Sequence, residues 1–490
     1  MPLLVALAPG WRARARAGTG GLRALGLGFV AGLVHFAGTV YWTSAVMRQF
    51  GDLPSVLAVV LMLLLAAYMA LYPAVAALAV HRLVRAFGAR ALLLAPAAWV
   101  ATELGRAHLF TGFPWVLLGY SQAGVVPIAQ LASLFGVYGL SALVVLANAG
   151  LALAVVGGGR TRWRPALVAL ALVAATWSWG TMRVRDGELT RIGTPLKVAL
   201  VQGNIPQEQK WDPSRAPGIL RRYVEMTREA ARGGARFIIW PESSLPFYFQ
   251  EDPAGGDVVR RLAHDTGAFI LAGSDQIERD DPPKFYNAAF LVTPDGTVGG
   301  IYRKMHLVPF GEYVPLKRFL FFASPLVEAV SDFSPGDDIA LLPVAGHPVT
   351  TAICYEVVYP GLARGAVARG SQLLTTITND AWYGRSSAPW QHFEQASLRA
   401  VEQGRFLARS ANTGISGIVD PYGRVVARSN LFEQAVVQGE VRLLEGRTVY
   451  SRIGDLFAYV LALLALAAVL VAWRTGPPAP APGFRPARSR

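Results

Sequence analysis

The sequence is poor in cysteine and in charged residues. Cys354 is the only cysteine among 490 residues, and only 16% of the residues are Asp, Glu, Lys or Arg. A single cysteine excludes an intrachain disulfide framework and a metal site built from several cysteines. The formal net charge is +14, but the arginines lie in short clusters between apolar runs, and no basic face is interleaved with aromatic residues. We therefore expect no binding of nucleic acid.

Apolar residues, in contrast, make up 53% of the chain, which is too many for one soluble domain. A helix needs about 20 apolar residues to cross the hydrocarbon core of a bilayer. Six runs approach this length, at 24–46, 55–80, 90–107, 133–156, 164–182 and 455–473. The leading segment MPLLVALAP is too short to span a membrane and lacks the cleavage site of a secretory signal. The sequence thus predicts an α-helical multi-span membrane domain.

The arginine clusters alternate along these spans. They precede the first predicted span and follow the second, fourth and last, whereas the intervening loops have only Arg48 and Arg106. Cytoplasmic loops of membrane proteins hold an excess of Lys and Arg. This pattern places both termini in the cytoplasm and the long segment before the last span outside, in the periplasm of a bacterium. We predict four regions: a membrane domain of about five spans at 1–182, an extramembrane domain at 183–454, a C-terminal span at 455–473 and a disordered Pro-rich tail at 474–490.

Two charged residues, Glu103 and Arg106, lie three positions apart in the predicted span 90–107. Ionisable residues inside a membrane are costly and often functional, so the pair could line a path for a lipid headgroup. An ion pair between helices explains the same two residues equally well.

The extramembrane segment has the pattern of an α/β domain. Strand-like runs such as LKVALVQ, RFIIWPE and VTTAICYE alternate with helical runs such as GILRRYVEMTREAAR. Two hairpins are predicted, in AAFLVTPDGTVGGIYRK and SGIVDPYGRVVARS, because each has a Gly-containing turn between β-rich arms. Roughly 270 residues suffice for one large layered core.

Three reactive residues follow strand-like runs in this segment: Glu242, Lys304 and Cys354. Side chains at strand ends converge at one edge of a sheet, where α/β enzymes commonly place their sites. A thiol that attacks a carbonyl needs a base to take its proton and a cation to hold the developing negative charge. Taken singly, each residue also fits a structural role: Glu242 that of a helix N-cap, Lys304 that of a solvated surface lysine and Cys354 that of a buried small hydrophobe.

The strings around these residues resolve the choice. WPES, YRKMHLVPFGEYVP and AICYE resemble the Glu–Lys–Cys signature of the nitrilase (carbon–nitrogen hydrolase) superfamily. A fuller set is similar to the apolipoprotein N-acyltransferase family over nearly the whole chain: LFTGFPWVLLGYSQ, VQGNIPQEQKWD, TNDAWYGRSSAPWQH and ANTGISGIVDPYG. The resemblance implies a four-layer αββα nitrilase-like domain. Family members usually have two further N-terminal spans, and this chain begins at what resembles the end of the second.

The resemblance also implies roles for individual residues. Cys354 is the nucleophile, Glu242 is the base, and Lys304 stabilises the oxyanion together with the backbone N–H of Tyr355. Supporting residues are of two kinds: carboxylates that orient the site, Glu312 and Glu356, and aromatic residues that form a lip over it, Trp211, Trp382 and Tyr383.

The implied reaction moves an acyl chain from a membrane phospholipid, through a Cys thioester, to the N-terminal amine of a diacylated apolipoprotein. It needs no cofactor and no metal, and we expect a monomer in the bacterial inner membrane. The residues leave two alternatives: a membrane-tethered amidase or nitrilase acting on a small periplasmic substrate, and a transporter or scaffold with an inactive appended domain. The intact Glu–Lys–Cys set argues against the second.

Overall fold

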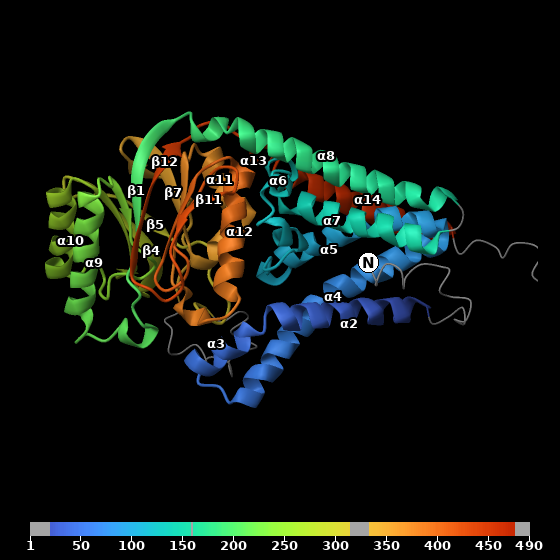
Figure 1. Cartoon of the computed structure of the whole chain (residues 1–490). Helices are drawn as coiled ribbons and strands as arrows, with labels where there is room; N and C mark the ends of the chain where they lie inside the picture. Colours follow the sequence, from blue (N-terminus) through green and yellow to red (C-terminus); the bar gives the residue numbers. More distant parts are fainter. Residues whose placement is uncertain (1–19, 158–159, 314–332, 476–490) are drawn as a thin grey trace, which may run out of the picture.

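The computed structural model describes residues 20–157, 160–313 and 333–475. It has a helical part and an α/β part that lie side by side (Figure 1). The arginines that precede the first predicted span, except Arg23, and the predicted tail from residue 476 onward lie outside the described residues.

The α/β part contains two six-stranded sheets. In spatial order the first sheet consists of β12 (Ala435–Leu443), β1 (Thr194–Gln202), β2 (Phe237–Ile239), β3 (Phe269–Glu278), β4 (Lys284–Val292) and β5 (Val298–Arg303). The second consists of β11 (Val425–Arg428), β10 (Gly417–Val419), β9 (Leu407–Ala411), β8 (Leu373–Thr378), β7 (His347–Ile353) and β6 (Leu342–Val344). The central pairs β1–β2, β2–β3, β7–β8 and β8–β9 are parallel.

Side-chain alternation in β1 shows how the layers form. Val198 and Leu200 pack into the core between the two sheets, whereas Ala199 and Val201 pack beneath the helices on the outer face. Those helices are α9 (Ala216–Arg232) and α10 (Pro253–Thr266), and the second sheet is covered by α11 (Pro360–Ala368) and α12 (Ala388–Gln403) (Figure 1). Strands buried on both faces read as continuous apolar runs, as these do in the sequence. The predicted four-layer αββα architecture is confirmed.

Both predicted hairpins are present. β4 pairs with β5 and β10 pairs with β11, each antiparallel. The first of these places Lys304 directly after the second arm of a hairpin, as the sequence indicated.

Five described helical segments are long and apolar enough to cross a membrane. They are α2 (Gly20–Thr39), α4 (Ser55–Phe87), α7 (Ala132–Val156), a segment at Thr161–Thr190 that contains α8 (Arg164–Asp186), and α14 (Leu456–Thr475). The predicted span at 90–107 differs: it consists of a 3-10 turn, η2 (Ala89–Leu94), and the 14-residue helix α5 (Ala95–His108). At 1.5 Å per residue α5 alone is about 21 Å long, and η2 adds about 12 Å at 2.0 Å per residue, so only the two together have the length of a hydrocarbon core of ~30 Å.

The helical part packs closely through small residues. A Cβ atom on Gly28 of α2 would lie 2.6 Å from the carbonyl oxygen of Pro73 and 2.7 Å from the Cβ of Ala77, both in α4. Gly32, one turn later, would place a Cβ 2.9 Å from the Cα of Ala70. Small residues that let helix backbones approach are typical of helix contacts in membranes.

Short helices and 3-10 turns lie between these elements. The helices among them are α3 (Trp42–Phe50), α6 (Val126–Ala129) and α13 (Val449–Ile453). The 3-10 turns are η3 (Leu109–Thr111), η4 (Leu118–Gln122), η5 (Arg160–Trp163), η6 (Glu188–Thr190), η7 (Gln207–Gln209), η9 (Cys354–Val358) and η10 (Asp380–Tyr383). α3 contacts η10 through Trp42 and Tyr383, and the loop between η3 and η4 contacts η9 through Trp115 and Tyr355, which is next to Cys354.

Candidate active site

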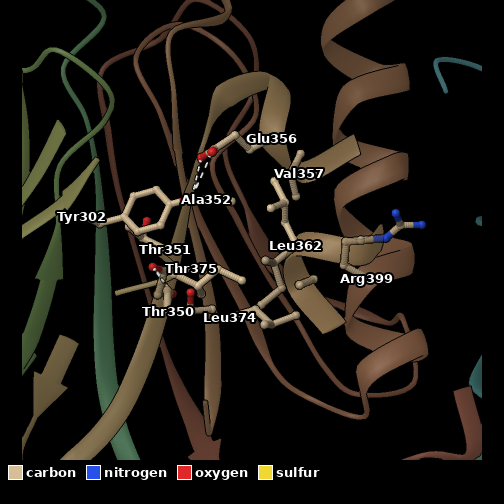
Figure 2. A pocket seen from close by; sticks show the side chains of 13 residues that line it. Tyr302, Thr350, Thr351, Ala352, Glu356, Val357, Leu362, Leu374, Thr375 and Arg399 are labelled. Atoms are coloured by element: carbon tan, nitrogen blue, oxygen red, sulfur yellow. Dashed lines mark hydrogen bonds between the residues drawn. The ribbon is translucent and has the colours of Figure 1, made fainter. Parts of the chain in front are cut away.

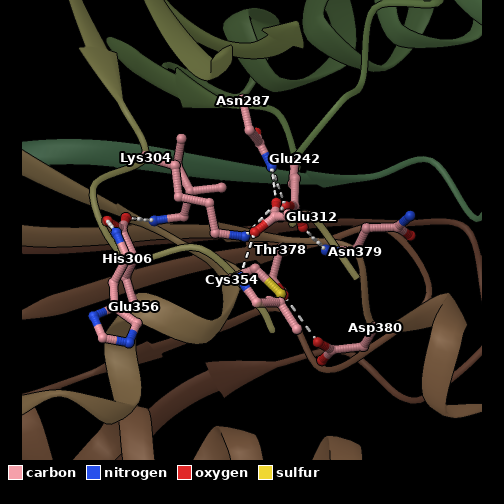
Figure 3. A network of polar contacts seen from close by, with 12 residues as sticks. Glu242, Asn287, Lys304, His306, Glu312, Cys354, Glu356, Thr378, Asn379 and Asp380 are labelled. Carbon is pink, nitrogen blue, oxygen red and sulfur yellow. Dashed lines mark hydrogen bonds and ion pairs between the residues drawn. The ribbon is translucent and has the colours of Figure 1, made fainter. Parts of the chain in front are cut away.

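The three residues singled out at strand ends come together between the two sheets. Glu242 follows β2, Lys304 follows β5, and Cys354 begins η9 directly after β7. Their side chains lie in one cluster of polar contacts (Figure 3). The expectation of a single sheet edge was too simple, because β2 and β5 belong to the first sheet and β7 to the second.

Glu242 is fixed by donors on both carboxylate oxygens. Its Oε1 accepts from Asn287 Nδ2 at 2.7 Å and lies 3.6 Å from Lys304 Nζ, while its Oε2 accepts from the backbone N–H of Asn379 at 2.8 Å. The backbone carbonyl of Glu242 accepts from Lys210 Nζ at 2.8 Å. A carboxylate held in this way keeps one orientation toward the cluster. The alternative role as a helix N-cap is wrong, because the next helix, α10, is capped by Asp252.

Lys304 is buried, with 1% of its surface exposed, so it is not a surface lysine. Its Nζ donates to Glu312 Oε1 at 2.8 Å, and that same oxygen accepts from Asn287 at 3.0 Å. Burial disfavours the ammonium, but Glu312 and Glu242 outweigh it and raise the pKa of Lys304 above its ordinary value. The site therefore holds a permanent cation between two carboxylates. Glu312 thus contacts Lys304, and its role in orienting Lys304 stays a prediction.

Cys354 is 6% exposed and occupies a left-handed backbone conformation, with φ of 53°. Such a conformation is rare for a residue other than glycine and is common at sites where a side chain is presented in a fixed direction. Burial, with a further contribution from the charge of Glu242, raises the pKa of the Cys354 thiol to about 12, against the opposing effect of Lys304. The resting group is thus a thiol, and its proton must be taken during attack.

Glu356, two residues after Cys354, accepts hydrogen bonds from backbone N–H groups. Its Oε1 accepts from the N–H groups of Met305 at 2.7 Å and His306 at 3.1 Å, and its Oε2 accepts from the N–H of Ile353 at 2.7 Å. The hydroxyl of Tyr302 donates to both oxygens at 3.0 Å. Glu356 thus joins the turn after β5, which bears Lys304, to the turn that bears Cys354.

A cavity next to Glu356 lies between β7–β8 and the helices α11 and α12 (Figure 2). Tyr302, Thr351 and Arg399 are among its lining residues. Its volume of ≈ 20 Å³ is enough for about one water molecule, so it is too small to receive an acyl chain.

The predicted aromatic residues contact the helical part of the molecule. Trp382 packs edge-on against Phe50 of α3, with ring centroids 4.6 Å apart, and Tyr383 packs against Trp42 at 4.9 Å. Trp211, in the loop after η7, has 48% of its surface exposed. Trp382 and Tyr383 thus pack against rings of the helical part that the sequence had not indicated, and the lip over the site stays a prediction.

Tyr355, next to Cys354, packs against the helical part. Its ring stacks on Phe113 and Trp115, from the loop between η3 and η4, with centroids 6.2 and 6.3 Å away. Its hydroxyl accepts a hydrogen bond from Tyr359 at 3.0 Å. Phe113 and Trp115 thus form an aromatic wall against which the side chain of Tyr355 packs. Only the backbone N–H of Tyr355 is left for the predicted oxyanion role.

Glu103 and Arg106 do not pair with each other. Glu103 accepts from the backbone N–H of Leu118 at 2.7 Å, and Arg106 donates to the carbonyls of Phe113 at 3.0 Å and Trp115 at 2.7 Å. Both residues therefore hold the loop that carries Trp115, and an ion pair between helices is not what they form.

Several buried polar residues of the site were not assigned roles from the sequence. They are Lys210, Asn287, Asp380, His392 and Arg409. Lys210, Asp380 and His392 lie within the strings VQGNIPQEQKWD and TNDAWYGRSSAPWQH, so those strings held a signal that went unused. Asn287 and Arg409 lie in strands and have no local signal. Among residues 20–157, 160–313 and 333–475, no group of three or more His, Cys, Asp or Glu side chains is arranged to hold a metal ion.

A thiol, a carboxylate and an ammonium buried together between two sheets are the groups that a carbon–nitrogen hydrolase domain would need, and here they stand beside helices long and apolar enough to cross a membrane. Comparison with known proteins agrees: residues 197–449 match the carbon-nitrogen hydrolase family, and residues 1–150 match the apolipoprotein N-acyltransferase N-terminal domain. The chain is 43% identical over 459 residues to the apolipoprotein N-acyltransferase of Geobacter metallireducens, covering 92% of this chain and 87% of that protein. With the protein of the same description from Methylococcus capsulatus it shares 38% identity over 433 residues, 87% of this chain and 83% of the other.

The chain belongs to the apolipoprotein N-acyltransferase family. Among solved structures, an amidase from Nesterenkonia sp. aligns with 22% identity and a TM-score of 0.41, covering 56% of this chain and 98% of the amidase.

Proposed function

We propose that this protein transfers an acyl chain from a membrane phospholipid to the N-terminal amine of a diacylated apolipoprotein, through a thioester on Cys354. The observation that carries the proposal is the single buried cluster of Cys354, Glu242 and Lys304 in a member of this family. The helical part supports a membrane setting for both substrates.

In the first half-reaction Glu242 takes the proton of the Cys354 thiol while the sulfur attacks the ester carbonyl of the phospholipid. Lys304 and the backbone N–H of Tyr355 stabilise the oxyanion. The ester C–O bond then breaks, Glu242 returns the proton to the leaving oxygen, and a lysophospholipid departs. Because the thiol is protonated at rest, base and nucleophile must act together.

In the second half-reaction the acceptor amine attacks the thioester carbonyl. A proton passes from the amine through Glu242 to the sulfur as the C–S bond breaks, which leaves an amide on the lipoprotein and restores the thiol. The aromatic lip of Trp211, Trp382 and Tyr383 shields the thioester from water and accommodates apolar chains.

The arginine distribution supports a location in the bacterial inner membrane, with the domain at 183–454 facing the periplasm and both termini in the cytoplasm. We propose a monomer with a membrane domain at 1–182 and a single returning span at 455–473.

The test is to incubate purified protein in phospholipid nanodiscs, first alone and then with a diacylated peptide. Mass spectrometry should find an acyl adduct on Cys354 in the first step and lysophospholipid with triacylated peptide in the second, and Cys354→Ser should give neither. Free fatty acid without triacylated peptide would instead make the protein a hydrolase. Absence of any adduct together with unchanged phospholipid would remove Cys354 from its role.

A further inference from the structure

A buried histidine holds the turn that carries Cys354. Nε2 of His392 lies 3.1 Å from the backbone carbonyl oxygen of Cys354, and His392 has no exposed surface. A carbonyl oxygen can only accept a hydrogen bond, so Nε2 carries the hydrogen and donates it. The contact is made to a residue whose backbone is strained, since φ of Cys354 is 53°.

The other side of the imidazole is fixed by charged groups. Nδ1 lies 3.0 Å from Asp380 Oδ1 and 3.1 Å from Arg409 Nη2. Asp380 in turn accepts from Arg409 at 2.8 Å and from the hydroxyl of Thr378 at 2.9 Å. Burial alone would raise the pKa of Asp380, but Arg409 and His392 reverse this and lower it, so its carboxylate is charged. With both nitrogens engaged, the ring has one orientation.

This contact determines where the next N–H group points. The carbonyl of Cys354 and the N–H of Tyr355 belong to one peptide unit, and in a planar trans peptide they point in opposite directions. A donor that holds the oxygen on one side therefore holds the hydrogen on the other. A hydrogen bond to the carbonyl also polarises the peptide, which makes its N–H a stronger donor.

We propose that His392 is a positioning residue that aims the backbone N–H of Tyr355 at the oxyanion formed during acyl transfer. Asp380 and Arg409 hold His392 in place. The inference rests on the proposed function, because it assumes that an oxyanion forms next to Cys354.

The same sulfur can undergo two reactions that differ in this requirement. Acylation by phospholipid passes through a tetrahedral oxyanion. Alkylation by iodoacetamide does not: a C–S bond forms at a saturated carbon, the C–I bond breaks, and the thiol proton is lost to solvent or base. A residue that aims the oxyanion donor should affect the first reaction only, whereas a residue that merely supports the fold or the thiol should affect both.

The experiment measures both rates for the full chain in nanodiscs. Removal of one oxyanion donor costs about 10²–10³-fold in rate, so His392→Phe should slow acylation of Cys354 on the order of 10²-fold. Its alkylation should stay within about threefold of the unmodified protein, because thiolate access is unchanged. A parallel loss of both rates, or normal acylation, would overturn the proposal.

A matched pair of polar variants covers the case in which His392→Phe does not fold. The side chain of glutamine is long enough to bring an amide N–H to the Cys354 carbonyl, and that of asparagine is not. His392→Gln should therefore acylate about tenfold faster than His392→Asn, with similar alkylation. Equal acylation in the two would contradict the role. If the unmodified protein forms no acyl adduct at all, the proposed function fails first; if it does and the variants match it, only this inference fails.

Discussion

The two parts of the molecule bury polar groups in different ways. Between the sheets, the side chain of Lys304 forms ion pairs with Glu242 and Glu312, and Arg409 forms one with Asp380. In the helical part, the close contacts of α2 with α4 are made by glycine, alanine and proline. The buried charges Glu103 and Arg106 bond there to the backbone of one loop. Charged side chains thus satisfy each other between the sheets, where we propose the chemistry, and the helical part contributes small apolar and aromatic side chains.

The two parts meet at Gln391, next to His392 in α12. Its Oε1 accepts from the indole N–H of Trp115 at 2.8 Å and of Trp42 at 3.2 Å, and its Nε2 donates to the carbonyl of Thr39 at 3.0 Å. Two consecutive residues of α12 therefore have different contacts. Gln391 binds Trp42 and Trp115, and His392 binds the turn that carries Cys354. If the two parts differ in this way, substitutions in the charged cluster should abolish the acylation of Cys354. Substitutions in the aromatic wall or in the contact between α2 and α4 should leave the reaction at Cys354 largely intact.

The largest effect should come from the charged cluster. Glu242→Gln and Lys304→Met should each lower the rate of Cys354 acylation by roughly 10³-fold or more, because they remove the base and the oxyanion cation, each of which contributes factors of 10²–10⁴. The measurement is the appearance of acyl-enzyme by mass spectrometry after a single exposure to phospholipid. Normal accumulation of acyl-enzyme in either variant, with failure only at the amine, would move that residue to the second half-reaction.

Much of this cluster was predictable from the sequence. Glu242, Lys304 and Cys354 stand at the ends of apolar strands, and strand ends in α/β domains are placed by the sheet. The partners that hold them were harder to identify, because Asn287 and Arg409 are single polar residues inside strands. Asn287 contacts Glu242, which follows another strand of the same sheet, and Arg409 contacts His392 in α12. The sequence predicted one span at 90–107, where the structure has a 3-10 turn followed by the helix at 95–108. The turn was missed because mean hydropathy over the whole segment does not distinguish the two kinds of helix.

The next effect concerns pH. Since burial and Glu242 raise the pKa of Cys354 to about 12, the thiolate fraction at lower pH should rise tenfold for each pH unit. Iodoacetamide labelling of the free enzyme should therefore accelerate about 10²-fold between pH 7 and pH 9. Because the pKa of the thiol is raised, the neutral thiol predominates below that value, and the labelling rate increases as the pH increases. A rate that is level from pH 7 upward would mean a preformed thiolate and would contradict the concerted role of Glu242.

A smaller effect should appear at the junction. Gln391→Leu leaves the two indole N–H groups without their shared acceptor and loosens the wall near the lip, at a cost of about 1–3 kcal/mol for each buried donor left unpaired. Acyl transfer from phospholipid should fall about tenfold, whereas turnover of a small soluble ester such as p-nitrophenyl acetate should stay within about twofold. Equal losses on both substrates would show that Gln391 serves the cluster, which would weaken the division between the two parts.

The smallest effect on acyl transfer should come from the contact between α2 and α4. A substitution there should lower the stability of the protein instead. In α2, a Cβ on Gly28 would meet backbone atoms of α4, with Pro73 oxygen at 2.6 Å and Ala74 Cα at 2.8 Å, whereas a Cβ on Gly26 meets nothing within 4 Å. Backbone atoms cannot rotate away as a side chain can, so Gly28→Ala must push the helices apart, at a cost of about 1–3 kcal/mol. Gly26→Ala, one half-turn away, should be neutral or slightly stabilising, because alanine is the better helix former.

Thermal unfolding in detergent should give a lower midpoint for Gly28→Ala alone, with turnover per folded molecule unchanged in both. Equal midpoints would show that the approach of α2 to α4 adds little to stability, and a loss of turnover in folded Gly28→Ala would show that this contact positions the site.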